Sequence, residues 1–322
     1  AALAQYGALR QVLAGELGVE PAAGTTRLYE QIRDGTLPPA PTAPSGESQR
    51  PAFLTQEVDP VERPVFVARE RELAWLEGSL EAALAGQGRV VLVTGGPGRG
   101  KTVLLHAFAR QAMAAHDGLL VAAGSCNAYS GLGDPHLPFR EVLAMLSGDV
   151  EGSWAAGAIG RDHALRLWAA LPLAGQALLD HGPHVVPALI PGLPLLTRLA
   201  TAAPDGATWL PPLRDRLERR GMAAEALEET DLFQQVTNLL RALAEARPLL
   251  LILDDLQWAD AASAGLLFHL GRRLAGSRIL IAGAYRPEEV IPRPASPRDP
   301  RTIPHPLRKV LAELQRQYGD IW

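Results

Sequence analysis

The residues best suited to chemistry lie in the segment VVLVTGGPGRGKT, residues 90–102. Its last eight residues, Gly95 to Thr102, fit the phosphate-binding pattern G-x-x-x-x-G-K-[ST]. Glycines let the backbone curl so that its N–H groups point at phosphate oxygens, and a helix that begins at the lysine directs its positive end at the same anion. We expect an exposed Lys101 to reach the β- and γ-phosphates and Thr102 to ligate Mg²⁺.

The lysine in this loop is informative because lysine is rare in the chain. Lysine and arginine together number 31, and only Lys101 and Lys309 are lysines. The alternative interpretation is an ordinary glycine-rich turn, but the apolar stretch RVVLVT in front of it is typical of a strand that leads into a phosphate-binding loop. The expected nucleotide contacts in the loop are Gly95, Gly96, Pro97, Gly98, Arg99, Gly100, Lys101, Thr102 and Val103.

A second segment, LLLILDDLQWAD, supplies the acids that a nucleotide site needs. Asp254 follows an apolar run and would stand at the carboxyl end of a strand, where open α/β sheets form their ligand crevice. We expect Asp254 to hold Mg²⁺ and Asp255 to orient a water that attacks the γ-phosphate of the nucleotide. The alternative for this pair is an acidic turn that caps a helix. Asp260 is most simply the N-cap of the helix that follows it, and a role at the nucleotide is the alternative.

Two further positions complete the expected site. Arg286 follows another apolar run and would emerge beside the acids, close to a γ-phosphate; the alternative is a surface arginine. In the segment FVARERE, Phe66 and Val67 could cover an adenine, with Arg69 and Glu70 fixing the segment in place. A charge cluster at the start of a helix explains the same residues equally well.

The elements that must position these residues follow an α/β pattern. Near-continuous apolar runs, without alternation, are typical of parallel strands that are buried on both faces. Such runs predict strands over 89–94, 118–125, 248–255 and 278–285. Apolar residues at helical spacing predict helices over 69–85, 101–115, 231–246 and 306–318. We interpret residues 126–230 as a helical insertion, residues 286–306 as a loop, and the ending DIW as the start of a fifth strand.

The start of the chain has a different character. Helical periodicity covers residues 1–17 and 23–33, and the two helices are too small to bury their apolar faces alone. We expect them to be the end of a larger helical array, so that the chain is a segment of a longer protein. The predicted domains are therefore a helical fragment at 1–34, a proline-rich linker at 35–61 and an ATP-binding domain at 62–322.

Composition narrows the class of protein. The net charge of −4 over 322 residues gives no electrostatic case for binding to nucleic acid or to a membrane. The only cysteine is Cys126, so an internal disulfide is impossible, and no apolar run is long enough for a membrane span. We expect a cytoplasmic location and no specific binding of DNA by this chain itself.

Together these motifs resemble the STAND division of the AAA+-related ATPases. The segment Phe66 to Glu72 is similar to that family's hhGRExE box, except that Ala68 stands in place of a glycine; the loop is similar to Walker A, and DDLQWAD to a Walker B segment. The resemblance implies a P-loop NTPase sheet in the order 5-1-4-3-2 with the fifth strand truncated, ATP or ADP with Mg²⁺ as ligands, and Arg286 as the sensor-1 arginine. No residue is a convincing arginine finger; Arg272 and Arg273 are candidates only because of their place on the helix after Walker B.

The first residues, YGALRQVLAGELGVEP onward, resemble the end of the bacterial transcriptional activator domain found in antibiotic-regulatory-protein activators. That resemblance implies a DNA-binding module upstream as a partner, and the resemblance to the STAND ATPases implies sensor modules downstream. The combined expectation is a slow ATPase that acts as a switch in a bacterial transcriptional regulator, with ATP-dependent self-association. Three alternatives stay open: a P-loop kinase or NTPase acting on a small substrate, a DNA-handling AAA+ ATPase, and a platform that binds ATP without hydrolysing it.

Overall fold

The computed structural model describes residues 51, 53, 69–127, 135–182, 184–220, 228–290 and 305–318. All of them lie in one compact unit, Ser48–Trp322. The two N-terminal helices, most of the linker, Phe66, Val67 and the fifth strand were predicted from the sequence and fall outside the described residues. The predicted domain boundaries stay predictions.

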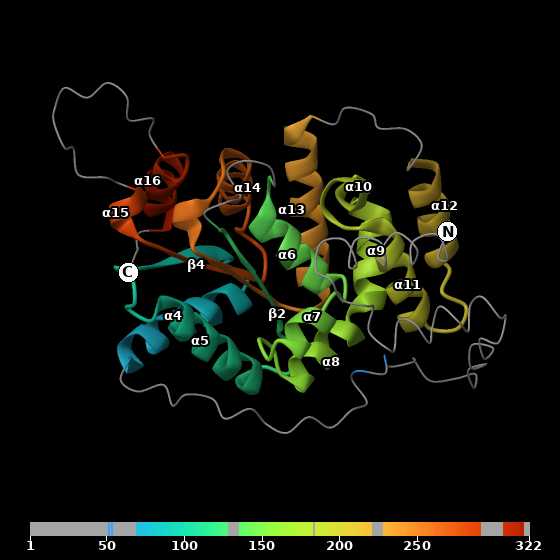
Figure 1. Cartoon of the computed structure of the whole chain (residues 1–322), viewed down its shortest axis with the longest axis horizontal. Helices are drawn as coiled ribbons and strands as arrows, with labels where there is room; N and C mark the ends of the chain where they lie inside the picture. The colour runs from blue at the N-terminus through green and yellow to red at the C-terminus, as the bar shows by residue number, and fades with distance from the viewer. Residues whose placement is uncertain are drawn as a thin grey trace, which may run out of the picture. The chain divides into compact units, whose positions relative to one another are not determined.

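A four-stranded parallel sheet forms the centre of the described unit (Figure 1). Its strands are β1 (Arg89–Thr94), β2 (Leu120–Ser125), β3 (Leu249–Asp254) and β4 (Ile279–Tyr285). Their order is β1-β4-β3-β2, and every neighbouring pair is parallel. This confirms the α/β class and the 1-4-3-2 part of the expected order.

Each strand is buried on both faces, which is why its sequence is continuously apolar. Val91 and Val93 of β1 join one core with α4 (Glu70–Leu84) and α5 (Lys101–Ala115). Val90 and Leu92 face the opposite core. The helices that contribute to this second core include α6 (Leu137–Leu146), α13 (Glu229–Ala246), α14 (Ala261–Gly271) and α16 (Leu307–Tyr318). Alternate residues of one strand therefore hold two helical layers against the sheet.

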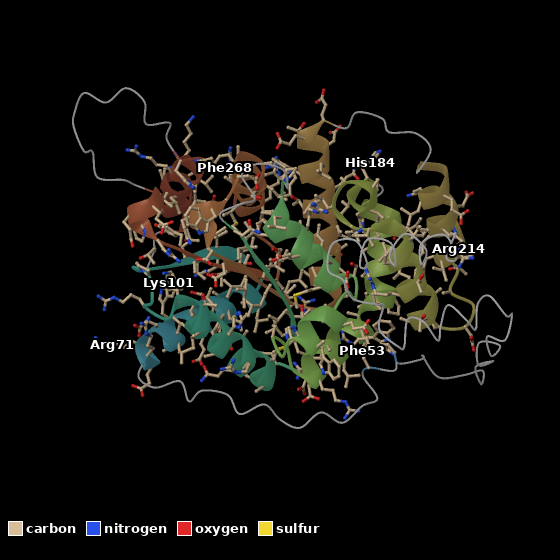
Figure 2. The ribbon with its side chains drawn as sticks, in the orientation of Figure 1. Phe53, Arg71, Lys101, His184, Arg214 and Phe268 are labelled. Atoms are coloured by element: carbon tan, nitrogen blue, oxygen red, sulfur yellow. The ribbon has the colours of Figure 1, made fainter. Side chains whose placement is uncertain are left out.

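The predicted insertion between β2 and β3 is helical throughout its described part. After α6 it contains α7 (Glu151–Ala155), α8 (Arg161–Ala169), α9 (Leu171–His181), α10 (Val185–Leu189), α11 (Gly192–Ala202) and α12 (Leu210–Arg220). A Cβ atom at Gly175 of α9 would lie 2.3 Å from the ring of Trp209, so the glycine is needed for this close approach. Figure 2 shows His184 and Arg214 in this block, well away from Lys101 at the start of α5.

Two sequence predictions need correction. Strand β2 begins at Leu120 and not at residue 118, because Asp117 and Gly118 form a turn. The loop expected over 286–306 contains a short helix, α15 (Pro287–Val290). Proline is favoured at the first helical position and acidic residues are favoured in the first turn, which accounts for the helix. No helix in the described ranges is long and apolar enough to cross a membrane.

Candidate nucleotide-binding site

The glycine-rich loop joins β1 to α5 at the carboxyl edge of the sheet. Gly98 and Gly100 have left-handed backbones with φ of 69° and 75°, a region that glycine adopts without steric cost. Gly100 is the N-cap of α5. Within the described part of the chain no side chain caps this helix, and its first turn carries no acidic residue. The first N–H groups of α5 are therefore suited to an anion.

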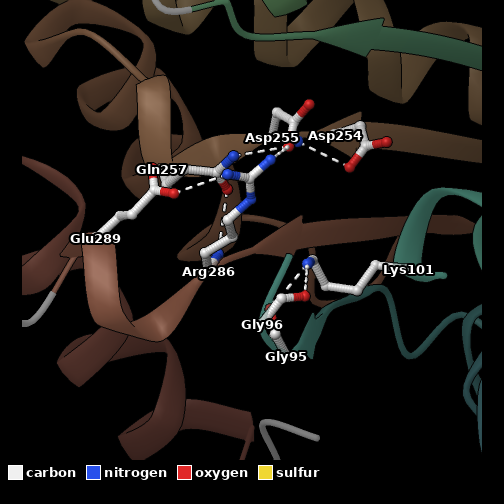
Figure 3. A network of polar contacts seen from close by, with 8 residues as sticks. All are labelled: Gly95, Gly96, Lys101, Asp254, Asp255, Gln257, Arg286 and Glu289. Carbon is white, nitrogen blue, oxygen red and sulfur yellow. Dashed lines mark hydrogen bonds and ion pairs between the residues drawn. The ribbon is translucent and has the colours of Figure 1, made fainter. Parts of the chain in front are cut away.

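Lys101 lies beneath this loop. Its Nζ donates to the backbone carbonyl of Gly95 at 2.8 Å and to that of Gly96 at 3.1 Å (Figure 3). Only 7% of its surface is exposed, so the expectation of an exposed lysine is wrong. The reason is that loop carbonyls satisfy the ammonium group. By contrast, Pro97, Arg99, Thr102 and Val103 are exposed beside it.

Asp254 is the last residue of β3 and Asp255 follows it, and the two acids differ in environment. Asp254 is 8% exposed, and its Oδ1 accepts a hydrogen bond from the backbone N–H of Asp255 at 2.8 Å, which fixes the carboxylate. Asp255 has a left-handed backbone with φ of 52° and a partly exposed side chain. Aspartate is one of the few residues besides glycine that tolerate this region. Asp260 is an N-cap, as predicted, because its Oδ1 accepts from Ser263 N at 2.8 Å.

Arg286 lies where the sequence placed it, beside the second acid. Thr94 pairs with Tyr285 across β1 and β4, so the loop and Arg286 leave neighbouring strands at the same edge. The Nη2 of Arg286 lies 4.0 Å from Asp255 Oδ1, and its Nη1 donates to Glu289 Oε1 at 2.8 Å (Figure 3). The hydrogen bond to Glu289 raises the pKa of the Arg286 guanidinium above its usual value.

The box before α4 is joined to the loop by one arginine. Arg69 is the N-cap of α4, and its Nη2 donates to the backbone carbonyl of Arg99. This contact agrees with the expectation that Arg69 fixes the segment in place, whereas Glu70 lies exposed at the start of α4. The proposed adenine contacts, Phe66 and Val67, lie outside the described residues.

Sequence reasoning missed three polar residues in this region. Gln257 Nε2 donates to Asp255 Oδ1 at 2.6 Å, and Glu289 binds Arg286. His305 Nε2 lies 2.9 Å from the Gln257 carbonyl, which connects the start of α16 to the turn after β3. The QW in DDLQWAD is a signal that could have drawn attention to Gln257. Glu289 follows Arg286 by three residues, and this i,i+3 spacing is also a local signal, whereas the contact of His305 depends on tertiary structure.

The arginine-finger candidates lie elsewhere. A Cβ atom at Gly88, just before β1, would lie 2.4 Å from the Leu274 carbonyl, so the segment directly after α14 lies at the amino edge of the sheet, opposite the loop. Arg272 stacks over Phe268 with its Cζ 5.5 Å from the ring centroid. A shallow cavity of about 440 Å³ lies there, lined by Arg272, Glu313, Arg316 and Gln317. Arg272 and Arg273 therefore do not reach the loop of their own chain.

The donor set fits ATP with Mg²⁺. The uncapped first turn of α5, the left-handed glycines and the lysine below the loop suit phosphate oxygens. Mg²⁺ usually keeps several waters and takes one or two protein oxygens together with phosphate oxygens. The Thr102 hydroxyl and the oriented carboxylate of Asp254 meet that requirement.

This parallel sheet, with its glycine-rich loop between β1 and α5 and an acid at the end of β3, defines a P-loop NTPase. The comparison with protein families gives the same class: residues 65–281 match the AAA ATPase domain. The match covers more than half of the chain, which therefore belongs to the AAA ATPase domain family. Residues 1–33 match the bacterial transcriptional activator domain, so both resemblances noted in the sequence are confirmed at the level of these families. No curated protein matches the chain significantly.

Proposed function

We propose that this chain is the ATP-dependent switch module of a bacterial transcriptional regulator of the STAND type. The observation that carries the proposal is the meeting of Arg286 with Asp255 at the edge where the phosphate-binding loop ends. One nucleotide state can be favoured over another only through different contacts. An arginine placed at the γ-phosphate would supply such a difference, because ADP lacks that group.

The proposed site assigns each residue a distinct role. The loop N–H groups and Lys101 bind the phosphates, as in Walker A sites, and Arg69 supports the loop from outside. Thr102 and Asp254 hold Mg²⁺, which when bound neutralises charge on the phosphate oxygens. Asp255 orients a water whose oxygen bonds to the γ-phosphorus while the bond from that phosphorus to the β–γ bridging oxygen breaks. The products are ADP and dihydrogen phosphate, which keeps both protons of the water.

Slow turnover suits a switch better than a motor. Asp255 is one methylene shorter than the glutamate that many ATPases of this division carry at this position, and its carboxylate lies 4.0 Å from the guanidinium of Arg286. In the proposed cycle ADP holds a closed form, ATP releases it, and hydrolysis sets the time. The setting that we propose is cytoplasmic.

Replacing Arg286 with alanine tests the sensing role. Since charge-assisted hydrogen bonds are strong, the ratio of ATP affinity to ADP affinity should fall by about tenfold or more. Competition titrations with the purified chain measure both affinities under one condition. Arg278→Ala is the control, because Arg278 binds the carbonyls of Ala244 and Glu245 at the amino edge of the sheet. An unchanged affinity ratio in Arg286→Ala removes Arg286 from the sensing role.

The match to the activator domain supports a role in transcription, and we propose that a separate upstream module contacts the promoter while downstream modules sense the signal. Acidic residues, 35 in number, exceed the 31 basic ones, and affinity for duplex DNA comes largely from clustered lysine and arginine. The chain alone should therefore not bind promoter DNA specifically. Sequence-specific binding in the nanomolar range at about physiological salt, seen in a gel shift, would contradict this division of labour.

A further inference from the structure

Gln257 lies at the centre of the polar contacts around the second acid. It belongs to η3 (Leu256–Trp258), a one-turn 3-10 helix directly after the acid pair, and only 2% of its surface is exposed. Its Nε2 donates to Asp255 Oδ1 at 2.6 Å, and its Oε1 accepts from the backbone N–H of Arg286 at 3.1 Å (Figure 3). One buried side chain thus bridges the ends of β3 and β4.

The chemistry of the neighbours fixes the orientation of this amide. A backbone N–H can only donate, so the amide oxygen must face Arg286. An ionised carboxylate can only accept, so the amide nitrogen must face Asp255. A glutamate here would lose the donor, and an apolar residue would lose both groups. The position therefore requires a side chain that donates at one atom and accepts at another.

The backbone at Asp255 makes the bond to Gln257 important for the direction of its carboxylate. The main chain at Asp255 has a left-handed φ of 52° and is fixed by two hydrogen bonds. Its N–H donates to the Asp254 carboxylate, and its carbonyl accepts from Trp258 N at 2.9 Å. The freedom that remains to the carboxylate is rotation about its side-chain bonds. The donor at 2.6 Å restricts that rotation.

We propose that Gln257 is a positioning residue for ATP hydrolysis. It holds the Asp255 carboxylate in the direction needed for the attacking water and fixes the main chain from which Arg286 extends, so that acid and arginine keep one geometry during turnover. This inference rests on the proposed roles of Asp255 and Arg286. If Gln257 had only a structural role, it would connect β3 and β4. Its replacement would then lower turnover only to the extent that it destabilises the fold.

The first test compares Gln257→Ala with Gln176→Ala in the whole chain. Gln176 is an exposed residue of α9 whose Nε2 donates to Asp180 at the same 2.6 Å, so it controls for loss of a Gln–Asp bond. We expect Gln257→Ala to lower kcat by about tenfold or more, with the Kd for Mg·ATP changed less than about threefold. Gln176→Ala should change neither. Unchanged kcat in a folded Gln257→Ala protein overturns the proposal, as does a loss confined to affinity.

The second test uses pH and the variant Gln257→Glu. This glutamate keeps an acceptor for Arg286 N but places a second carboxylate against Asp255. Two carboxylates in contact share a proton at low pH, and the protonated form can again donate. The kcat of Gln257→Glu relative to wild type should therefore rise as the pH falls from about 8 to about 6. A ratio that does not change with pH contradicts the positioning role.

A third readout needs no nucleotide and tests the contact between Gln257 and Asp255 on which the inference rests. Like charge raises the carboxyl pKa in folded Gln257→Glu above its unfolded value, so the variant loses stability as pH rises through the folded pKa and regains it as pH falls. Urea unfolding measures the difference in free energy of unfolding between Gln257→Glu and wild type. This difference should become smaller as the pH falls towards 5. If wild type fails to hydrolyse ATP, the proposed switch and the positioning role both fail; if wild type hydrolyses ATP, the kcat of Gln257→Ala decides the positioning role by itself. A difference in stability that stays constant with pH means that the side chain at position 257 does not contact Asp255, and this overturns the inference.

Discussion

The guanidinium of Arg286 donates to the carboxylate of Glu289 at 2.8 Å, one turn further along the chain. The arginine proposed to sense a terminal phosphate is therefore already bound to an anion of its own protein. A γ-phosphate would compete with Glu289 for the same N–H groups. We therefore expect the Glu289 carboxylate to limit how strongly Arg286 can respond to ATP.

Replacing Glu289 with glutamine should raise ATP affinity relative to ADP. The neutral amide holds the guanidinium less strongly, and partly exposed ion pairs of this kind correspond to about a two- to fivefold effect. Competition titration measures the ratio. Glu313→Gln is the matched control, because Glu313 binds Arg316 at 2.6 Å in the same i,i+3 spacing but lies on α16. An equal change in both variants would mean that Glu289 acts only through the net charge of the protein and not through its bond to Arg286.

Lys101→Ala should abolish ATP binding and leave the fold intact. The mutation removes the ammonium from the phosphate site together with its two bonds to Gly95 and Gly96, which lie in the loop and not in either core. Labelled-nucleotide binding and thermal melting measure the two effects, and the melting temperature should shift by only a few degrees. Lys309→Ala, which removes the only other lysine from an exposed position, should bind ATP normally. Wild-type binding by Lys101→Ala contradicts the site assignment.

The two acids should separate binding from turnover. Asp254→Asn keeps an acceptor for the Asp255 N–H but lowers the charge next to Mg²⁺, so it should weaken Mg²⁺-dependent binding more than metal-free binding. Asp255→Asn should leave binding nearly unchanged and reduce kcat. Titrations with and without Mg²⁺, together with phosphate release, measure these effects. Equal losses of affinity in both variants would contradict the assignment of Mg²⁺ binding to Asp254 and of turnover to Asp255.

Cys126 should be unreactive in the folded protein. The residue is 4% exposed, and burial raises the pKa of its thiol to about 12. Because the thiolate is the reactive form, a thiol-disulfide reagent at pH 8 should modify native Cys126 at least about a thousandfold more slowly than the urea-unfolded chain. The rate is measured with a chromogenic disulfide under both conditions, and comparable rates would show that the thiol is accessible. The N–H of Cys126 donates to the Asp254 carbonyl at 3.0 Å. Slow labelling therefore also indicates that the end of β3 is shielded from solvent.

The strands and the loop could be predicted because their signals are local. Continuous apolar runs marked β1, β3 and β4 to within a residue at each end, and helix α5 begins and ends at the predicted positions, Lys101 and Ala115. The position of Arg286 beside Asp255 followed from the rule that parallel strands end at one edge. The binding and catalytic roles of these residues stay predictions.

The polar contacts that bind the site together could not be read from the sequence. Gln257 meets Arg286 through the spacing of β3 and β4, and His305 meets Gln257 through the packing of α16. Burial of Lys101 was missed because a lysine is ordinarily expected in solvent, whereas here two loop carbonyls accept from it. Such contacts arise from the assembled fold and leave no periodic pattern along the chain.

The pairing of β1 with β4 also determines the order in which the nascent chain can assemble. Arg89 pairs with Leu280 and Thr94 with Tyr285, and β2, β3 and the whole helical insertion are synthesised between them. At about 5–20 residues per second, β1 leaves the ribosome on the order of 10–40 s before its partner. During that interval the apolar strand offers unpaired edges to other chains. The phosphate-binding loop is thus made early, but a nucleotide site that includes Arg286 cannot form before Tyr285 has emerged.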